Sequence, residues 1–414
     1  MTDFICQAQA ARKASYDWAL ANRSQKDQAL MAMADQLLES SAAIIEANQR
    51  DVAAGQASGL SESLIDRLSL DQARLSAMAT GLRQVASLAD PVGQVLRGWR
   101  LDNGANVEQV RVPFGVIGII YEARPNVTAD AAAICLKSGN AALLRGSSTA
   151  IHSNRRIISS LRAGLVVAGA DPDLLALVEG DHQVTSQMMR ARGLIDLLIP
   201  RGGAGLIKSV VEQATVPVIE TGTGNCHLFI DADADVEMAW SIIVNAKTQR
   251  PSVCNALETL LIDQSVAPKI LPMLVDRLSQ LGVDLQGDQA AHDLCPQLNL
   301  VPDDGWDEES LRLHLRIGLA DGLESAIAFI RQHGSGHSET IVTNDLTHQR
   351  RFTAAIDAAC VLVNCSSRFV DGSEFGFGAE IGISTQKLHA RGPMALSEMT
   401  SSKYVIQGSG QTRR

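Results

Sequence analysis

The chain has 414 residues, of which 46% are apolar and 4% aromatic. At roughly 150 residues per domain, this length predicts two or three domains, and the apolar content is sufficient to fill their cores. The formal net charge is −10 at pH 7. An acidic chain with few aromatic side chains lacks the basic, stacking surface that nucleic acids need, so we expect no nucleic-acid partner.

The lengths of the apolar runs and the spacing of the cysteines exclude further classes of protein. The longest runs, such as Val116–Tyr121 and Leu194–Pro200, are far shorter than the ~20 residues of a membrane helix, so we expect no membrane contact. The first residues have no basic segment ahead of an apolar stretch and do not resemble a secretory signal. Seven scattered cysteines without a CxxC pair predict neither a disulfide framework nor a metal site. We therefore expect a cytoplasmic protein.

The N-terminal quarter of the chain is predicted to be helical. Apolar residues at helical spacing over residues 2–89 predict four helices that end before Pro91. The Asn-Gly pair at positions 103 and 104 then lies between extended segments and predicts a hairpin over Gly98–Val112. Because a hairpin of this size is not stable alone, we expect it to pack on another domain or subunit.

After Pro113, short apolar runs alternate with helical stretches. This is the pattern of parallel strands that are buried on both faces and connected by helices, and it predicts a doubly wound nucleotide-binding domain. A second α/β unit is predicted to begin near Cys226, with a strand at His227–Ile230 and a helix at Val236–Lys247. The strands predicted in the first unit are Gly115–Tyr121, Ala141–Leu144, Leu174–Val178, Leu194–Ile199 and Pro217–Ile219.

One cysteine is a candidate nucleophile. Cys254 follows a predicted helix and precedes an apolar strand, in the kind of loop that often carries function. Lys247 and Arg250 can lower the pKa of its thiol electrostatically and so favour the reactive thiolate. A buried, inert thiol is the alternative interpretation. We prefer that inert interpretation for Cys135, Cys226, Cys295, Cys360 and Cys365.

Two loops favour a bound dinucleotide. The segment Pro200–Gly205 follows a predicted strand and opens a helix, so the backbone N–H groups at Gly202 and Gly203 can receive phosphate oxygens. A tight strand-to-helix turn explains these glycines equally well, since neither GxGxxG nor a Walker lysine is present. Arg145 ends another predicted strand and is followed by hydroxyl side chains, including that of Ser148.

Four longer strings point to one family. They are VPFGVIGIIYEARPNVT (112–128), IPRGGAG (199–205), VNAKTQRPSVCNALETL (244–260) and STQKLHARGPM (384–394). They closely resemble the glutamate-5-semialdehyde dehydrogenases, also called γ-glutamyl phosphate reductases, of the aldehyde dehydrogenase superfamily. The resemblance covers essentially the whole chain.

The resemblance implies an aldehyde dehydrogenase-like α/β fold with two doubly wound domains and a small β arm. The implied parts are an NADP-binding domain (1–97 and 113–225), a catalytic domain (226–385) and an oligomerisation arm (98–112 and 386–414). A hairpin with a free edge strand can extend the sheet of a neighbouring subunit, so we expect a homo-oligomer.

The implied reaction is the NADPH-dependent reduction of L-glutamate 5-phosphate to L-glutamate 5-semialdehyde with release of phosphate, the second step of proline biosynthesis. Cys254 would attack the acyl phosphate and form a thioester. Asn126 would stabilise the oxyanion with its side-chain amide, and its alternative role is to cap the following helix. Whether the chain binds glutamate 5-kinase, which acts before it, is left open.

The resemblance also suggests cofactor ligands. Arg145 replaces a lysine that lies near the adenosine ribose, and a plain surface charge is the alternative. Ser148 replaces a glutamate typical of NAD-preferring members, which leaves room for a 2′-phosphate and favours NADPH and NADP+. Glu309 loosely matches a glutamate that binds the nicotinamide ribose, but we prefer the interpretation of a solvated acidic turn.

The substrate ligands and the competing functions remain open. Arg250 and Lys247 could hold the leaving phosphate, although cations are favoured at a helix C-terminus in any case. Arg391 is a candidate ligand of the substrate α-carboxylate. Glu220 lies where hydrolytic aldehyde dehydrogenases carry their general base, so a hydrolytic NAD(P)-dependent aldehyde dehydrogenase is one alternative. A catalytically idle nucleotide-binding homologue is the other.

Overall fold

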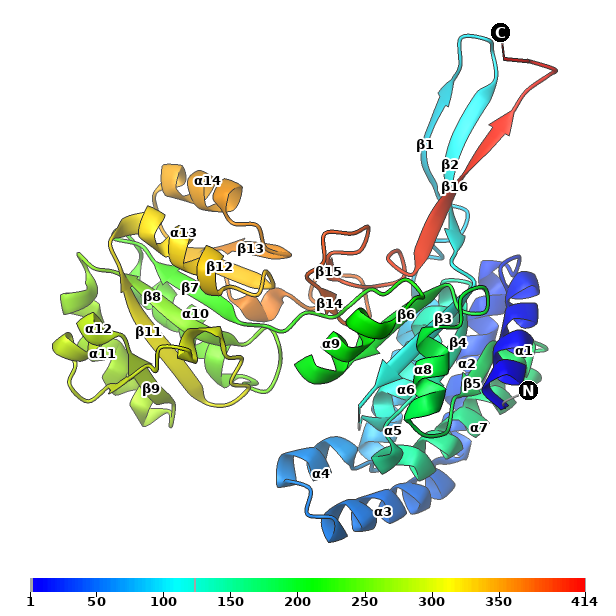
Figure 1. The fold of residues 1–414 in the computed structure, drawn as a ribbon, viewed down its shortest axis with the longest axis horizontal. Helices are drawn as coiled ribbons and strands as arrows, with labels where there is room; N and C mark the ends of the chain where they lie inside the picture. The colour runs from blue at the N-terminus through cyan, green and yellow to red at the C-terminus, as the bar shows by residue number, and fades with distance from the viewer. Residues whose placement is uncertain (1–2, 123, 414) are drawn as a thin grey trace. The chain divides into compact units, whose positions relative to one another are not determined.

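The structure, a computed structural model, describes residues 3–122 and 124–413. It divides into two compact units (Figure 1). The first unit comprises Met1–Thr221, Gly376–Gly382 and Met394–Arg414, and the second comprises Gly222–Phe375 and Ile383–Pro393. Each unit contains one parallel sheet with its own helices, so the predicted α/β class with two parallel sheets is confirmed.

Five helices precede the first strand in the described part of the chain, one more than predicted. They are α1 (Asp3–Trp18), α2 (Arg23–Glu39), α3 (Ser41–Ala57), α4 (Glu62–Leu68) and α5 (Gln72–Ser87). The start of α2 is a capping box, in which the Gln25 N–H donates to Asn22 Oδ1 at 3.0 Å and the Asn22 N–H donates to Gln25 Oε1 at 2.9 Å. The helix count is wrong because α2 and α3 meet at the single residue Ser40, where apolar spacing alone shows no interruption.

The parallel sheet of the first unit has the strand order β5-β4-β3-β6. Its strands are β3 (Val116–Tyr121), β4 (Ala141–Arg145), β5 (Leu175–Leu177) and β6 (Leu197–Arg201). The later helices of this unit are α6 (Pro125–Lys137), α7 (Ile151–Val167), α8 (His182–Met189) and α9 (Ala204–Gln213). The predicted strand at Pro217–Ile219 is not formed, because Val218 makes only an isolated bridge to Leu198.

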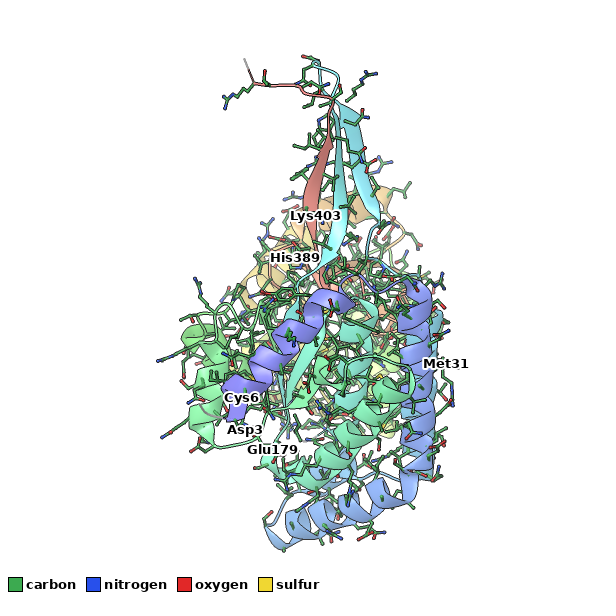
Figure 2. All side chains as sticks on the ribbon, turned by 90° about the vertical axis from the view of Figure 1, so that its right-hand side faces the viewer. Asp3, Cys6, Met31, Glu179, His389 and Lys403 are labelled. Carbon is green, nitrogen blue, oxygen red and sulfur yellow. The ribbon has the colours of Figure 1, made fainter. Side chains whose placement is uncertain are left out.

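The predicted hairpin is confirmed. Strands β1 (Val95–Arg100) and β2 (Asn106–Pro113) pair antiparallel, and the C-terminal strand β16 (Thr400–Gln407) joins the other edge of β2. Gly104 has φ +87° in the turn, a conformation that glycine adopts without strain. Figure 2 shows side chains, including that of Lys403, projecting from both faces of this sheet. All of β1 is exposed, and its expected pairing with a second copy of the chain stays a prediction.

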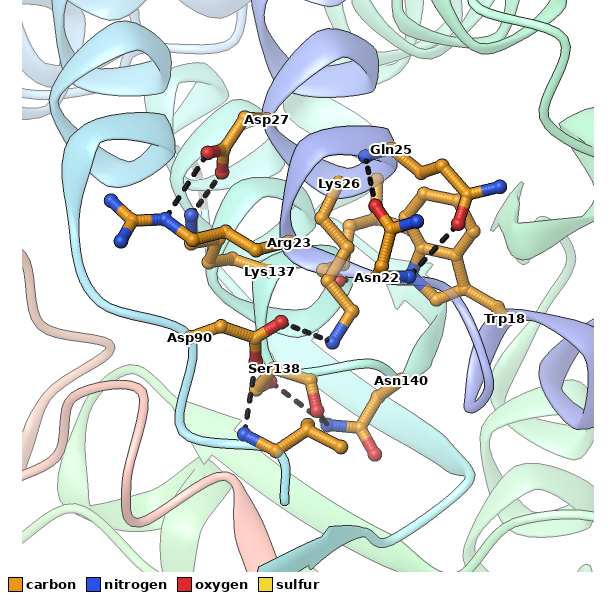
Figure 3. A network of polar contacts seen from close by, with 12 residues as sticks. Trp18, Asn22, Arg23, Gln25, Lys26, Asp27, Asp90, Lys137, Ser138 and Asn140 are labelled. Atoms are coloured by element: carbon orange, nitrogen blue, oxygen red, sulfur yellow. Dashed lines mark hydrogen bonds and ion pairs between the residues drawn. The ribbon is translucent and has the colours of Figure 1, made fainter. Parts of the chain in front are cut away.

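Buried polar contacts link β16 to the parallel sheet of the first unit, and Figure 3 shows the neighbouring polar network around Lys26, Asp90, Ser138 and Asn140. Asn140, fully buried after α6, donates from Nδ2 to the Met399 carbonyl just before β16 at 2.9 Å, and its Oδ1 accepts the Gly115 N–H at 2.9 Å. Nearby, buried Lys26 pairs with Asp90 at 2.8 Å. Because each buried polar group has a partner, the junction between β16 and the parallel sheet keeps a defined geometry.

The second unit is built on a seven-stranded, fully parallel sheet of order β10-β9-β11-β8-β7-β12-β13. Its strands are β7 (Cys226–Ile230), β8 (Leu257–Asp263), β9 (Asp284–Gly287), β10 (Asn299–Leu300), β11 (His314–Ala320), β12 (Ser338–Val342) and β13 (Cys360–Val363). Its helices are α10 (Val236–Thr248), α11 (Ala267–Gln280), α12 (Gln289–Leu294), α13 (Gly322–His333) and α14 (Leu346–Ala355). Short pieces complete the described chain, namely β14 (Ile383–Ser384), β15 (Gly392–Pro393) and the 3₁₀ turns η1 (Ser148–Ala150), η2 (Pro172–Leu174), η3 (Gly305–Asp307) and η4 (Ser367–Phe369).

Consecutive strand residues of the second sheet enter different cores. Leu228 packs with α10, α11 and α12 on one face, whereas its neighbour Phe229 packs with α13 and α14 on the other. Leu260 and Leu261 of β8 divide in the same way. This is the period-two alternation of a strand covered on both faces, and it explains why the strands read as continuous apolar runs.

A glycine in α7 allows close packing of two helices, which gives a test of the fold. A Cβ at Gly164 would lie 2.5 Å from the Met33 Cα and 2.6 Å from the Met33 nitrogen in α2, whereas a Cβ at Gly81 in α5 would meet only Asp130 Oδ1, at 3.8 Å. We therefore expect Gly164→Ala to destabilise the protein by about 1–3 kcal/mol. The matched control Gly81→Ala should be neutral or stabilise it by up to about 1 kcal/mol. Urea denaturation followed by circular dichroism measures both, and equal midpoints would contradict the close approach.

Candidate active site

Cys254 lies in the second unit, in the loop that connects α10 to β8. Its side chain is half-buried and packs against the buried side chains of Leu362, Val370 and Ile383. It takes part in no disulfide. A half-buried thiol at the end of a rigid helix can be both held in place and reached by a substrate, as a nucleophile requires.

The segment before β7 fixes one side of this loop. A Cβ at Gly224 would lie 1.5 Å from the Cys254 carbonyl oxygen, so only glycine allows the two backbones to approach this closely. The thiol of buried Cys226 donates to the same carbonyl at 3.2 Å. The sequence analysis did not assign Gly224 or Cys226 to the site, because both contacts join residues about thirty positions apart.

The turn η4 holds the other side of the loop. The carbonyl of Asn255 accepts the Ser367 hydroxyl at 2.6 Å, and its side-chain amide donates to the Val370 carbonyl at 2.9 Å. The guanidinium of Arg368 donates to Asn255 Oδ1, and its Nε donates to Gln249 Oε1 at 2.9 Å. Cys254 is therefore fixed through the residue that follows it.

Arg368 is a second cation beside the nucleophile, in addition to Arg250. Burial and the nearby positive charge of Arg250 lower the pKa of Arg368, while the charge of Cys254 acts in the opposite direction. The carboxylates of Asp371 and Glu374 also raise the pKa of Arg368, so groups of both signs lie around this guanidinium. Sequence analysis missed Arg368, which lies 114 positions after Cys254 and outside the strings that carry the resemblance.

Glu309 lies beside the same loop. Its Oε1 accepts the Gly224 N–H at 2.8 Å. Burial raises the pKa of Glu309, and the bond from Gly224 partly offsets that rise. Glu309 is thus not a solvated acidic side chain in a surface turn, although its role toward a nicotinamide ribose stays a prediction.

Lys247 has a different environment from the one that a phosphate ligand needs. Its ammonium is fully buried and pairs with the fully buried Glu258 at 3.3 Å. Glu258 also accepts the Ser310 N–H at 3.2 Å and the Leu311 N–H at 3.3 Å. Burial lowers the pKa of Lys247, and Glu258 partly restores it. Lys247 therefore joins α10, β8 and the segment that carries Glu309, and we give it no part in holding phosphate.

Arg391 and Arg250 differ in how far their guanidinium groups are engaged. Arg391 pairs with Asp357 Oδ1 at 2.7 Å and donates to the Asp357 carbonyl at 3.1 Å. Lys387 contacts the same carboxylate, and the two cations hold the pKa of Asp357 below its usual value. Arg250, by contrast, is exposed just before Cys254.

The first unit carries the predicted oxyanion donor. Asn126 is exposed in the first turn of α6, and its amide donates to Asp130 Oδ2 at 3.1 Å rather than capping the helix. Burial raises the pKa of Asp130 to about 6, and the bond from Asn126 opposes this rise. The role of Asn126 in catalysis stays a prediction.

Comparisons with known proteins agree with this fold and loop. Residues 2–300 match the aldehyde dehydrogenase family. A γ-glutamyl phosphate reductase of Cutibacterium acnes is 57% identical over 99% of this chain and 98% of its own length, and one of Clostridium novyi is 52% identical over 98% of both. The crystal structure of γ-glutamyl phosphate reductase from Thermotoga maritima is 42% identical, covers 100% of both chains and superimposes with a TM-score of 0.98. The chain belongs to the γ-glutamyl phosphate reductases of the aldehyde dehydrogenase family.

More distant members share the fold alone. An acetylating aldehyde dehydrogenase from Geobacillus thermoglucosidasius is 16% identical with a TM-score of 0.71 and covers 100% of this chain. Membership of the aldehyde dehydrogenase family implies a nicotinamide nucleotide as cofactor. It follows that the first unit, with its doubly wound topology, is the place to look for groups that fit one.

The turn between β6 and α9 fits the diphosphate of such a cofactor. Gly203 is the N-cap of α9, and as a glycine it offers no side-chain cap. The Leu206 N–H donates to the Gly203 carbonyl at 3.0 Å. A helix start without a side-chain cap of this kind can receive phosphate oxygens at its remaining N–H groups. A Cβ at Gly202 would lie 2.6 Å from the Glu122 carboxyl carbon, so that glycine is needed for packing as well.

Arg145 and Ser148 lie at the carboxyl end of β4 in the same unit. Ser148 is exposed at the start of η1. Arg145 donates to the carbonyls of Val178 at 3.1 Å, Gly180 at 2.8 Å and Asp181 at 2.9 Å, and its Nε donates to Thr185 at 2.6 Å. Arg145 thus orders the β5–α8 loop, and its contact with a cofactor stays a prediction.

No helix in the described part of the chain has both the length and the apolar character of a membrane span. Residues 3–122 and 124–413 likewise contain no cluster of three or more His, Cys, Asp or Glu side chains that could hold a metal ion.

The environments of the cysteines predict selective alkylation. Burial raises the pKa of Cys135 to about 12 and that of Cys226 well above its usual value, so both stay protonated and unreactive at pH 8. Cys6 is exposed and Cys254 half-buried. Peptide mapping of the native protein after iodoacetamide treatment should find Cys6 and Cys254 modified and Cys135 and Cys226 intact, with all four modified after denaturation. Modification of native Cys226 as fast as Cys254 would contradict this arrangement.

Proposed function

We propose that this chain reduces L-glutamate 5-phosphate to L-glutamate 5-semialdehyde with NADPH and releases phosphate, with Cys254 as the nucleophile. The observation that carries the proposal is the half-buried Cys254, with exposed Arg250 four residues before it, in a chain 57% identical to a protein named γ-glutamyl phosphate reductase. This reaction is a step of proline biosynthesis.

The first step uses the sulfur of Cys254. Its attack on the acyl carbon forms a C–S bond, and the bond from that carbon to the phosphate oxygen breaks, so phosphate leaves with the bonding electrons. Exposed Arg250, four residues before Cys254, neutralises charge on the leaving group. The glutamyl group is then held on Cys254 as a thioester.

The second step regenerates the thiolate. When bound, the reduced nicotinamide supplies a hydride to the thioester carbon. Cys254 then leaves with the electrons of the C–S bond, and the semialdehyde is released. Gly202 and Gly203 would bind the cofactor diphosphate through the α9 N–H groups. Ser148 places no carboxylate against a 2′-phosphate, which supports NADPH over NADH.

The reverse reaction tests this proposal without the labile acyl phosphate. Wild-type protein should oxidise L-glutamate 5-semialdehyde with NADP+ only when phosphate is present. Cys254→Ala should lower this turnover by about 10³-fold or more while NADPH binding, followed by fluorescence, is retained. The matched control Cys6→Ser changes an exposed thiol on α1 and should keep wild-type turnover.

The same assay separates the competing functions. Equal oxidation without phosphate, with glutamate as the product, would indicate a hydrolytic aldehyde dehydrogenase and contradict the proposal. NADPH binding without any turnover would indicate an idle nucleotide-binding homologue. Full turnover by Cys254→Ala would exclude Cys254 as the nucleophile.

A further inference from the structure

A cavity of about 240 Å³ opens in the second unit between the end of α10 and the chain after η4. Its polar lining consists of Asn245, Gln249, Arg368, Asp371, Ser373 and Glu374. Asn245 and Gln249 lie in the string 244–260, and the other four lie outside all the strings that resemble the family. The reaction steps above use none of the six. The cavity therefore has no role in the account so far.

The cavity adjoins the nucleophile. Arg368, in its wall, donates to the side chain of Asn255, the residue that follows Cys254. Gln249, also in its wall, accepts a hydrogen bond from Arg368 at 2.9 Å and lies in the same loop as Cys254. Val370, between two lining residues, belongs to the apolar cluster against which Cys254 packs. The cavity wall and the nucleophile therefore share Asn255 and Val370 as neighbours.

The charges in the wall are of both signs. Arg368 supplies one guanidinium, and Asp371 and Glu374 supply two carboxylates. Asp371 Oδ1 accepts the Ser373 N–H at 2.9 Å and the Ser373 hydroxyl, so this carboxylate is oriented by the turn that follows it. The carboxylate of Glu374 is exposed, and its charge acts on Arg368 across the cavity wall. It is available to a ligand cation.

We propose that this cavity binds the α-amino-acid end of the substrate, with Arg368 on the α-carboxylate and Glu374, assisted by Asp371, on the α-ammonium. This inference rests on the proposed function and extends it to the groups that select an amino acid. In L-glutamate 5-phosphate only three carbon–carbon bonds separate the acyl carbon from the carbon that bears both charged groups. The ligand therefore offers a carboxylate to the guanidinium of the wall and an ammonium to its carboxylates.

The alternative occupant, the phosphate group, fits this cavity poorly. Two carboxylates in the wall repel a dianion, and a single guanidinium cannot offset both. Arg250, which does not line the cavity, remains the cation for the leaving phosphate. The side chain of Arg391, already paired with Asp357 at 2.7 Å, is engaged elsewhere in the unit.

Substrates that lack one charged group test the assignment. Glutarate semialdehyde lacks only the α-ammonium, and 4-aminobutanal lacks only the α-carboxylate. The assays contain NADP+ and phosphate. Glu374→Gln should lower kcat/KM for L-glutamate 5-semialdehyde by about 10–100-fold, mainly by raising KM. The same variant should keep kcat/KM for glutarate semialdehyde within about twofold of the wild-type value. Arg368→Lys should lower kcat/KM for both carboxylate substrates more than for 4-aminobutanal, whose smaller loss reflects the contact of Arg368 with Asn255 beside Cys254.

A matched control and the contrary outcomes complete the design. Glu324→Gln replaces an exposed carboxylate on α13 that pairs with Arg351, and should behave as wild type on all three aldehydes. Equal losses for Glu374→Gln on all three aldehydes, or no loss on any, would overturn the inference. Wild-type protein that shows no phosphate-dependent oxidation of L-glutamate 5-semialdehyde would instead overturn the proposed function, so the two failures are distinct.

Discussion

The position of the Cys254 backbone is the constraint on which the site depends. The absence of a side chain at Gly224 lets the two backbones approach until a Cβ would lie 1.5 Å from the Cys254 carbonyl oxygen. The Cys226 thiol donates to that carbonyl, and Asn255 is held from the opposite side by Ser367 and Val370. The loop is thus fixed from two directions, and the sulfur does not have to be ordered again when substrate arrives.

The buried polar groups beneath this loop serve the same purpose. The Lys247–Glu258 pair is removed from water, and such a pair stabilises a fold only where further hydrogen bonds satisfy it. The backbone N–H groups of Ser310 and Leu311 supply them and so fix the segment that carries Glu309. Glu309 in turn accepts the Gly224 N–H. A continuous set of contacts therefore connects the interior of the second unit to the active loop.

Local patterns in the sequence predict the helices and strands more accurately than they predict the contacts between those helices and strands. Continuous apolar runs predict β3, β4, β7 and β8, because strands covered on both faces lose polar alternation. The Asn-Gly pair predicts the hairpin because its turn needs glycine at positive φ. The helix boundary at Ser40 is missed because it leaves the apolar spacing intact. The strand at Pro217–Ile219 is predicted wrongly because this segment pairs with β6 only through the single bridge at Val218 and does not continue as a ladder.

Prediction of the site residues from the sequence has the same limit. Cys254 is predictable because a cysteine, cations and a helix end lie close together in the sequence. Arg368, Gly224 and Cys226 act through contacts between distant segments, which no local pattern reveals. Lys247 resembles a phosphate ligand in the sequence, but Glu258, on the neighbouring strand, keeps its ammonium buried.

The most direct measurement of the central claim is the mass of the protein after it reacts with L-glutamate 5-semialdehyde and NADP+ in the absence of phosphate. The account predicts a gain of one glutamyl group, located on the peptide that contains Cys254, and its loss when phosphate is added. An unchanged mass, an adduct on another residue, or an adduct that phosphate does not release would contradict it.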